Sequence, residues 1–396
     1  MSFRTSETNN QEAGVDEADL IKVTKNGYIY TVSGNKLNIV RAYPIGYFTN
    51  PAYYASTTFH ISFKPTAIFI EGSYLAVFGT RTTGGVVSTL IIIYNIQNNL
   101  TPVFSNFYEY QGDYFDGRKN GGTGYVYLVS HIPVSNFPWY KLNNGGTTYQ
   151  LPLSDIRIYP PFDPTTPKVF INIVSFSLRV PHPSNFNMKS IVTEKVREIY
   201  MSYRSIYISY TDYINGLDYT RINKIYVWGS GIWPLYQRTI LGTVHNQFAF
   251  DEYYNTGVLR VITTRYNSNT HNHRSISVYS LNFYFQILSQ KHYICPYDRV
   301  TATRYYDKSL YVGTGNGSLF IVTFQPNHYF INVYNKVNLQ GIPRYMHLLT
   351  SNYLLSFGKR SGNQGLKVWV YDVTAPWNPQ QIGFFELTDQ FANSIL

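Results

Sequence analysis

Short apolar and aromatic runs recur along the chain, each bounded by polar or turn-forming residues. The seven clearest runs cover residues 28–32, 74–78, 125–129, 206–210, 258–263, 310–313 and 353–357. Runs of roughly four to eight residues between turn signals are typical of β-strands. A glycine stands in the expected tight turn just before the first two runs, at Gly27 and Gly72, where positive φ is needed. The pattern therefore predicts an all-β chain.

The spacing of these runs predicts how the strands are grouped. Their starts lie 46, 51, 81, 52, 52 and 43 residues apart. A four-stranded propeller blade occupies roughly 40 to 50 residues, so five intervals hold one blade and the long interval holds a blade with an insertion. We expect a seven-bladed β-propeller of four-stranded antiparallel blades, with eight blades or an incomplete ring as alternatives. Residues 1–15 form an N-terminal tail and residues 16–396 a single propeller domain, with the insertion at 131–167 in blade three.

Each blade can be expanded into four strands. The first blade is expected at 20–24, 28–32, 37–42 and 58–63, and the second at 66–70, 74–78, 89–94 and 102–108; blades four to seven start near residues 197, 246, 299 and 344. Third strands end in an aromatic-polar-aliphatic triplet, at 94–96, 176–178, 279–281 and 371–373. Repetition at blade distance supports a repeat array.

Composition limits the possible partners. Charged residues make up 14% of the chain, whereas Tyr alone contributes 39 residues; an average globular chain carries roughly 25% charged residues. The net charge is +10, but the 32 Lys and Arg residues are scattered, with no run of four. We therefore expect no specific nucleic-acid binding and prefer a solvated basic surface over a coat that attracts lipid headgroups, glycans or acidic proteins.

Two further features bear on the compartment. Cys295 is the only cysteine, which excludes an internal disulfide and every cysteine-based zinc motif. The opening residues 1–10 are polar, and no run of 18 apolar residues exists, so we expect neither a signal peptide in the chain as given nor a transmembrane segment. The chain is expected to be soluble, with any export signal missing or removed.

Several motifs resemble one known family. They comprise residues 7–22 (ETNNQEAGVDEADLIK), 112–119 (GDYFDGRK), 246–248 (NQF) with 251–253 (DEY), and 364–367 (QGLK) leading into 371–373 (YDV). Together they span nearly the whole chain, and in these motifs it resembles the secreted β-propeller family distantly related to WD repeats. The resemblance implies a propeller exported or displayed at the surface of archaea and some bacteria, or on a virion in a viral relative. It implies no established activity.

Three carboxylates precede the first expected inner strand. Asp16, Glu17 and Asp19 should lie near the mouth of a central channel, where hard oxygen ligands could bind Ca²⁺. No D-x-D-x-D loop follows, and alternate side chains on an extended segment point in different directions. We prefer the structural interpretation, in which these carboxylates cap turns or pair with arginine, and expect no other cofactor.

A second set of charged residues falls on expected inner strands or at their entries. Arg118, Asp251, Glu252, Arg299 and Arg304 could recognise a charged ligand at the channel mouth. Alternatively, opposite charges pair across blades and set their register, and this is the interpretation that we prefer.

Histidines offer weaker candidates for chemistry. His271 and His273 could share one face of a strand and hold a metal, but an exposed polar loop is preferred. His245 lies near Asp251 in the sequence, as a base and its orienting carboxylate would, yet no activated nucleophile accompanies them.

The insertion at 131–167 is the preferred interaction site. It carries Trp139 and Tyr140 beside prolines, and exposed aromatic side chains offer a large contact area at low entropic cost. The alternative is that it folds back over the outer edge of its blade.

These observations favour a non-enzymatic extracellular or surface-displayed scaffold that binds protein or glycan partners. One alternative is a structural component of a virion or cell-envelope assembly, within which the chain would be part of a larger particle. The other is a hydrolase or lyase acting at the channel mouth with Asp16, Asp19, Asp251 and Arg299.

Overall fold

The computed structural model describes residues 11–12, 14–43, 54–143, 146–159, 168–194, 196–266, 275–325, 330–334, 336–360 and 365–387. These residues form 33 strands in seven sheets. Three single-turn 3-10 helices accompany them: η3 (Leu153–Asp155), η4 (Pro183–Asn185) and η5 (Gln247–Ala249). The all-β class is confirmed.

The chain divides into two compact units. The first comprises Met1–Val196, Met201–Ile206 and Lys224–Leu235, and the second comprises Arg197–Tyr200, Tyr207–Asn223 and Tyr236–Leu396.

The first unit contains three sheets. The first sheet has the order β2 (Ile21–Val23), β3 (Tyr28–Ser33), β4 (Lys36–Arg41) and β5 (Tyr54–Thr58). The second has the order β13 (Thr148–Gln150), β12 (Trp139–Leu142), β9 (Val103–Gln111), β8 (Val86–Asn95), β7 (Tyr74–Thr83) and β6 (Phe63–Glu71). The third has the order β1 (Val15–Glu17), β10 (Asp113–Asn120), β11 (Tyr125–Pro133), β15 (Val169–Ser177), β16 (Asn187–Thr193) and β14 (Ile156–Ile158).

The fourth sheet contains residues of both units, in the order β17 (Glu198–Met201), β18 (Ser205–Ile214), β19 (Leu217–Trp228) and β20 (Gly231–Leu241). The fifth has the order β21 (Phe250–Tyr253), β22 (Val258–Arg265), β23 (Ser275–Leu281) and β24 (Ile287–Ile294). The sixth has β25 (Val300–Tyr306), β26 (Ser309–Thr314), β27 (Ser318–Phe324) and β28 (Ile331–Val333), with β29 (Val337–Asn338) also paired to β27. The seventh has β30 (Gly341–Thr350), β31 (Tyr353–Arg360), β32 (Leu366–Asp372) and β33 (Gln380–Leu387).

Each of the seven apolar runs is a strand in its own sheet, as predicted. They are β3, β7, β11, β18, β22, β26 and β31. Gly27 and Gly72 have φ of 83° and 56°, which confirms the positive φ expected in those turns. In six of the seven sheets the run pairs with the strands directly before and after it in the chain, whereas β11 pairs with β10 and, beyond the insertion, with β15. Each repeat deduced from the spacing therefore corresponds to one sheet.

Consecutive sheets pack face to face through alternating side chains. In β7, Leu75 and Val77 belong to a core cluster with residues of the first sheet, whereas Ala76 and Phe78 belong to one with residues of the third. The two faces of a strand alternate with period two, so the second sheet is covered on both sides. In the second unit, Leu310 of β26 packs in the cluster shared with the fifth sheet, and Tyr311 in the cluster shared with the seventh.

The repeated triplet at the end of the third strands has a packing role. Its last residue is buried at Ile96, Leu178, Leu281 and Val373. In three cases its N–H donates to a carbonyl in or beside the turn that precedes the second strand, as in Ile96 N to Ser73 O at 2.8 Å and Val373 N to Asn352 O at 2.8 Å. The triplet therefore closes each sheet where strands two and three meet.

The first sheet differs from the expected strands at its outer end. Its fourth strand is β5, and residues 58–63, which were predicted to form it, contain the turn into the second sheet. Phe63 N donates to His60 O at 2.9 Å and Ser62 N to His60 Nδ1 at 3.1 Å. The rings of Phe59 and Phe63 pack edge to face at 5.3 Å, so these residues look strand-like in sequence although they pack around a turn.

The N-terminal segment forms a strand that the sequence pattern did not predict. Val15–Glu17 pairs antiparallel with β10 and so adds a strand to the third sheet, with Asp16 opposite Lys119 and Glu17 opposite Arg118. Val15 was predicted to belong to the N-terminal tail, and Asp16 and Glu17 only to precede the first inner strand.

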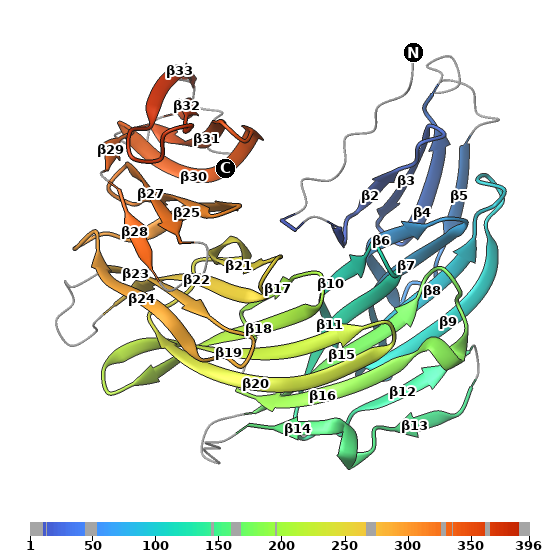
Figure 1. Ribbon diagram of the computed structural model, residues 1–396. Helices are drawn as coiled ribbons and strands as arrows, with labels where there is room; N and C mark the ends of the chain where they lie inside the picture. The colour runs from blue at the N-terminus through green and yellow to red at the C-terminus, as the bar shows by residue number, and fades with distance from the viewer. Residues whose placement is uncertain are drawn as a thin grey trace. The chain divides into compact units, whose positions relative to one another are not determined.

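Most of the described insertion is ordered on the edges of two sheets. Hairpin β12–β13 pairs with β9 of the second sheet, and β14 pairs in parallel with β16 of the third (Figure 1). Leu151 is buried, and Tyr140 and Ile156 pack against the same core cluster. The insertion forms strands because it buries these side chains, and it lies on the outer edges of the third sheet and of the second. Residues 144–145 and 160–167 lie outside the described residues.

Candidate functional site

The carboxylate of Asp16 is engaged by two lysines. Asp16 Oδ1 accepts from Lys22 Nζ at 2.8 Å, and Asp16 Oδ2 lies 3.7 Å from Lys119 Nζ. Lys119 also donates to Glu71 Oε2 at 2.8 Å, and Arg179 Nε donates to Glu71 Oε1 at 2.8 Å. The five side chains form one ion-pair network that connects the first three sheets.

Glu71 is the centre of this network. Burial alone would raise the pKa of its carboxyl, but the hydrogen bonds and charges of Lys119 and Arg179 outweigh burial and hold the pKa below its ordinary value. A carboxylate whose negative charge is balanced by two cations stabilises the packing of its sheets, and we do not expect it to bind a ligand.

The remaining candidates of the first unit are also engaged. Arg118 is buried and donates to Asp116 Oδ1 at 2.6 Å, with the charge of Glu17 close enough to raise the pKa of Arg118 further. Asp19 is held through its backbone, since Ile68 N donates to Asp19 O at 2.8 Å. No group of three or more His, Cys, Asp or Glu side chains that could hold a metal occurs among the described residues; His271 and His273 lie outside them.

Asp251 and Glu252 lie in the second unit on β21. Asp251 pairs with the buried Arg260, whose Nε donates to Oδ2 at 2.7 Å. Glu252 accepts from the hydroxyl of Tyr207 through its carboxylate and donates its N–H to Tyr200 Oη at 2.6 Å. The structure thus brings Asp251 and Glu252 into separate buried contacts, and Arg304 contributes charge to the surroundings of Asp251.

Trp139 and Tyr140 of the insertion lie on β12. The ring of Tyr140 stacks on Tyr149 at 5.4 Å and contacts Phe186 at 5.4 Å, and Lys141 Nζ lies 5.1 Å from the centre of the Trp139 ring. Tyr140 is therefore a packing residue of this hairpin, whereas Phe137 and Tyr149 are 41% and 45% exposed. Contact of this surface with a partner stays a prediction.

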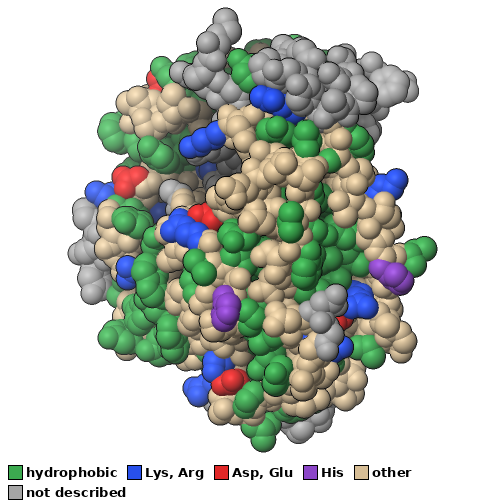
Figure 2. Space-filling model, turned by 90° about the vertical axis from the view of Figure 1, so that its right-hand side faces the viewer, with side chains coloured by type: hydrophobic (Ala, Val, Ile, Leu, Met, Phe, Trp, Pro, Cys, Tyr) green, Lys and Arg blue, Asp and Glu red, His purple; other side chains and the backbone are tan. Residues whose placement is uncertain are grey.

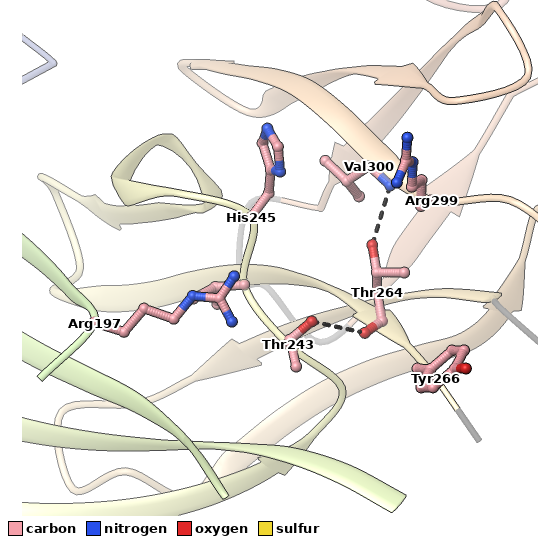
Figure 3. Close-up of a pocket in the computed structure, with 8 residues that line it drawn as sticks. Arg197, Thr243, His245, Thr264, Tyr266, Arg299 and Val300 are labelled. Atoms are coloured by element: carbon pink, nitrogen blue, oxygen red, sulfur yellow. Dashed lines mark hydrogen bonds between the residues drawn. The ribbon is translucent and has the colours of Figure 1, made fainter. Parts of the chain in front are cut away.

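Arg299, in contrast, lines a pocket of about 240 Å³ in the second unit. Its polar side chains are Arg197, Thr243, His245, Thr264, Tyr266 and Arg299 (Figure 3). Val244 and Val300 complete the lining. The pocket contains two arginines and a histidine, and none of its lining residues is a carboxylate.

Three sheets position these side chains. Arg197 directly precedes β17, His245 lies in the segment before β21, and Arg299 directly precedes β25. Thr243 and Thr264 form an antiparallel bridge with N–H···O distances of 2.8 and 2.9 Å, and Val300 N donates to Thr264 Oγ1 at 3.0 Å. Figure 3 shows these bonds beneath His245, which lies between the two arginines.

The two arginines of the pocket form few contacts that would neutralise their charge. Arg197 Nη1 donates to Thr211 Oγ1 at 2.9 Å, and in the described part of the chain neither Arg197 nor Arg299 forms an ion pair with a carboxylate. Asp218 does not line the pocket. Burial raises the pKa of its carboxyl, and the charge of Arg197 lowers it. The side chains that line the pocket therefore carry a net positive charge.

His245 responds to this environment. Loss of solvent contact within the pocket, followed by the positive charges of Arg344, Arg197 and Arg299, lowers its pKa below the ordinary value; a hydrogen bond to the backbone of Thr301 opposes the shift. Burial and the neighbouring positive charges thus both favour the neutral imidazole over the imidazolium.

Sequence reasoning singled out Arg299 and noted His245, but it missed Arg197, Thr243, Thr264 and Arg344. A repeat signal could have found the basic residues. Arg197, His245, Arg299 and Arg344 all stand at or near the first strand of four consecutive sheets, and equivalent positions of neighbouring repeats lie on one face of an array. The threonines carried no comparable signal.

The family described as "Beta propeller domain" matches residues 5–396. The chain belongs to this family, which confirms the resemblance drawn from its motifs. Two archaeal relatives are similar to it: an uncharacterized protein of Methanocaldococcus jannaschii, 30% identical over 213 residues, and an uncharacterized protein of Archaeoglobus fulgidus, 29% identical over 216 residues.

These matches cover 54% and 53% of this chain but only 30% and 33% of the relatives. The chain therefore spans about a third of the length of the curated relatives that it matches. Their names state no activity, ligand or partner. Among the described residues there is no helix with the length and apolar character needed to cross a membrane.

Proposed function

We propose that the seven sheets are the blades of a seven-bladed propeller and that the protein is a non-enzymatic scaffold that binds a partner through an anionic group. The observation that carries this proposal is the convergence of Arg197, His245 and Arg299 on one pocket whose lining includes no carboxylate. Arginine presents a planar fork of donors that matches carboxylate, sulfate and phosphate groups. An acidic protein segment or an anionic glycan would supply such a group.

The pocket favours binding over catalysis. General acid–base or nucleophilic catalysis requires a base oriented by a third group beside an activated nucleophile. Here the Thr264 hydroxyl accepts from Val300 N, and Thr243 Oγ1 lies 3.4 Å from Thr264 O. Both hydroxyls hold the backbone in place, and no carboxylate of the lining orients His245.

We place this scaffold at the cell surface, outside the cell, or on a virion. The motif resemblance supports this location. On the face drawn in Figure 2, Lys and Arg side chains are spread singly among hydrophobic and neutral polar side chains. The face drawn there shows no continuous basic patch among its described residues, which disfavours nonspecific polyanion binding through that face.

Retention of the full chain on dextran sulfate, alginate and neutral dextran tests the proposal. Arg197→Gln/Arg299→Gln should weaken binding to at least one anionic matrix by about tenfold or more, since one charge-assisted hydrogen bond contributes roughly 1.5–3 kcal/mol. The matched control is Arg157→Gln/Arg238→Gln, which removes the same charge from exposed positions outside the pocket. Equal loss in both variants would contradict a pocket-specific function.

A further inference from the structure

The donors of the pocket restrict the chemistry of its ligand, given the proposed function on which this inference rests. Two guanidinium groups and one imidazole come from segments before three different first strands. One guanidinium already satisfies a carboxylate through two parallel hydrogen bonds. A tetrahedral oxyanion carries more oxygens and, as sulfate or a phosphate monoester, more charge, so it can be shared among all three groups.

The rest of the lining suits a group attached to that oxyanion. Tyr266 is half-buried, and Val244 and Val300 are buried beside the charged side chains. An aromatic ring and two aliphatic side chains offer contact to the carbon skeleton of an ester, as in ligand sites that combine apolar walls with a few polar groups.

We propose that this pocket binds a tetrahedral oxyanion of the sulfate or phosphate class, as the free ion or as an ester, through Arg197 and Arg299, with His245 taking up a proton as the oxyanion binds. Among the described residues, the charges that lower the pKa of the imidazole are all positive. These are Arg197 before β17, Arg299 before β25 and Arg344 on β30, with the backbone of Thr301 as its hydrogen-bond partner. A bound doubly charged anion reverses the sign of the local field and favours imidazolium.

The direction of the pH dependence follows. The pKa of His245 lies below its ordinary value in the empty pocket and rises when the anion binds. Affinity therefore increases as pH falls from the bound-state pKa towards the free-state pKa, and it levels off below the latter. Burial raises the pKa of Asp218 against the opposing charge of Arg197, and the His245→Gln variant separates its titration from that of His245.

Isothermal titration calorimetry of the full chain with sodium sulfate is the test. Sulfate remains doubly charged between about pH 5 and 8, whereas phosphate monoesters titrate near pH 6, so sulfate isolates the contribution of the protein. Titrations in two buffers with different ionisation enthalpies report the protons taken up. We expect sulfate to bind severalfold more tightly at about pH 5.5 than at about pH 7.5, with uptake of up to one proton.

Three variants separate the contributions. Arg299→Gln should reduce sulfate affinity about tenfold or more, His245→Gln should retain binding but lose proton uptake and pH dependence, and Arg238→Gln should behave as the parent chain. Unchanged thermal unfolding of the variants shows that the fold is intact. Inorganic phosphate and dextran phosphate, compared with sulfate and dextran sulfate, then show which member of the class binds more tightly.

The outcomes distinguish this inference from the proposed function. If alginate is retained through Arg197 and Arg299 while sulfate and phosphate do not bind, the scaffold function stands and the oxyanion assignment is wrong. If sulfate binds with no proton uptake in the parent chain, the role of His245 is wrong. If no anion depends on the two arginines, both proposals fail.

Discussion

The guanidinium group of Arg260 lies against the carboxylate of Asp251, with Nε donating to Oδ2 at 2.7 Å. Arg260 is 1% exposed and packs among the rings of Tyr253, Tyr305 and Phe324, at 4.9, 5.1 and 5.0 Å from their centres. Asp251, which the sequence offered as a site residue, is thereby part of the structural core of the second unit.

Replacement of Arg260 should be strongly destabilising. Arg260→Met leaves Asp251 buried without its partner and removes three cation–π contacts, so we expect the free energy of unfolding to fall by about 3–5 kcal/mol. Urea denaturation of the full chain followed by fluorescence measures this change. Arg265→Met, at a half-buried position of the same strand, should lower the free energy of unfolding by less than about 1 kcal/mol. Comparable losses in both variants would argue against a special contribution of the contacts between Arg260, Asp251 and the three rings.

Acid should weaken the first unit through Glu71. Its folded-state pKa lies below the ordinary value, so its contribution to stability is present above the unfolded-state pKa, roughly 4.3, and is lost as pH falls through the folded-state pKa. Glu71→Gln should therefore be destabilising at neutral pH, and the difference from the parent should shrink below about pH 4. Melting temperatures of parent and variant over this range provide the measurement. Glu194→Gln, which removes the 3.2 Å ion pair with Lys168, is the control. If the difference in melting temperature between Glu71→Gln and the parent chain stays constant with pH, Glu71 is not the group that makes the first unit sensitive to acid.

Two glycines at corresponding places of different sheets should resist substitution. A Cβ on Gly79 would lie 2.1 Å from Lys64 O, and one on Gly358 would lie 2.1 Å from Ile342 O. Each glycine pairs with a proline beside a register shift, Pro65 in one sheet and Pro343 in the other.

Gly79→Ala and Gly358→Ala should each cost roughly 1–3 kcal/mol or more, because a backbone atom must move. Gly383→Ala meets nothing within 4 Å and should be nearly neutral. Denaturant midpoints of the three variants give the comparison; tolerance of alanine at both bulge positions would show that the close approach does not exist.

The insertion hairpin should depend on Tyr140. Tyr140→Ala removes a ring packed between Tyr149 and Phe186, so β12 should detach from β9 before the rest of the sheet unfolds. Hydrogen exchange should show faster exchange in 139–142 and along β9, whereas Tyr149→Ala, at a more exposed ring, should produce a smaller effect. Unchanged protection of β9 in Tyr140→Ala would contradict this role.

The sequence predicted the repeat well because the central strands carry their own signal. Residues 126–129 and 258–263 are buried on both faces and are therefore largely apolar, with Arg260 as the charged exception, and triplets such as 371–373 recur because each closes the same junction. Pairing of Val15–Glu17 with β10 had no such signal, since three residues show no period and the partner is about a hundred residues away.

The site was less accessible from sequence. Arg299 was singled out because it begins a repeat, but a pocket formed by Arg197, His245 and Thr264 depends on the juxtaposition of three sheets. Asp16 and Asp251 were attractive as carboxylates near expected strand entries, and the structure pairs each with a cation. The sequence shows which residues are charged, but only the fold shows which of these charges neutralise one another.

Selenate, an anomalous scatterer that mimics sulfate, can show whether the pocket binds a tetrahedral oxyanion. Crystals of the full chain grown without sulfate or phosphate should be soaked in dilute selenate and measured at the selenium edge. We expect an anomalous peak within hydrogen-bond distance of the guanidinium groups of Arg197 and Arg299 and of the His245 ring. Selenate peaks elsewhere, with none in this pocket, would contradict this expectation.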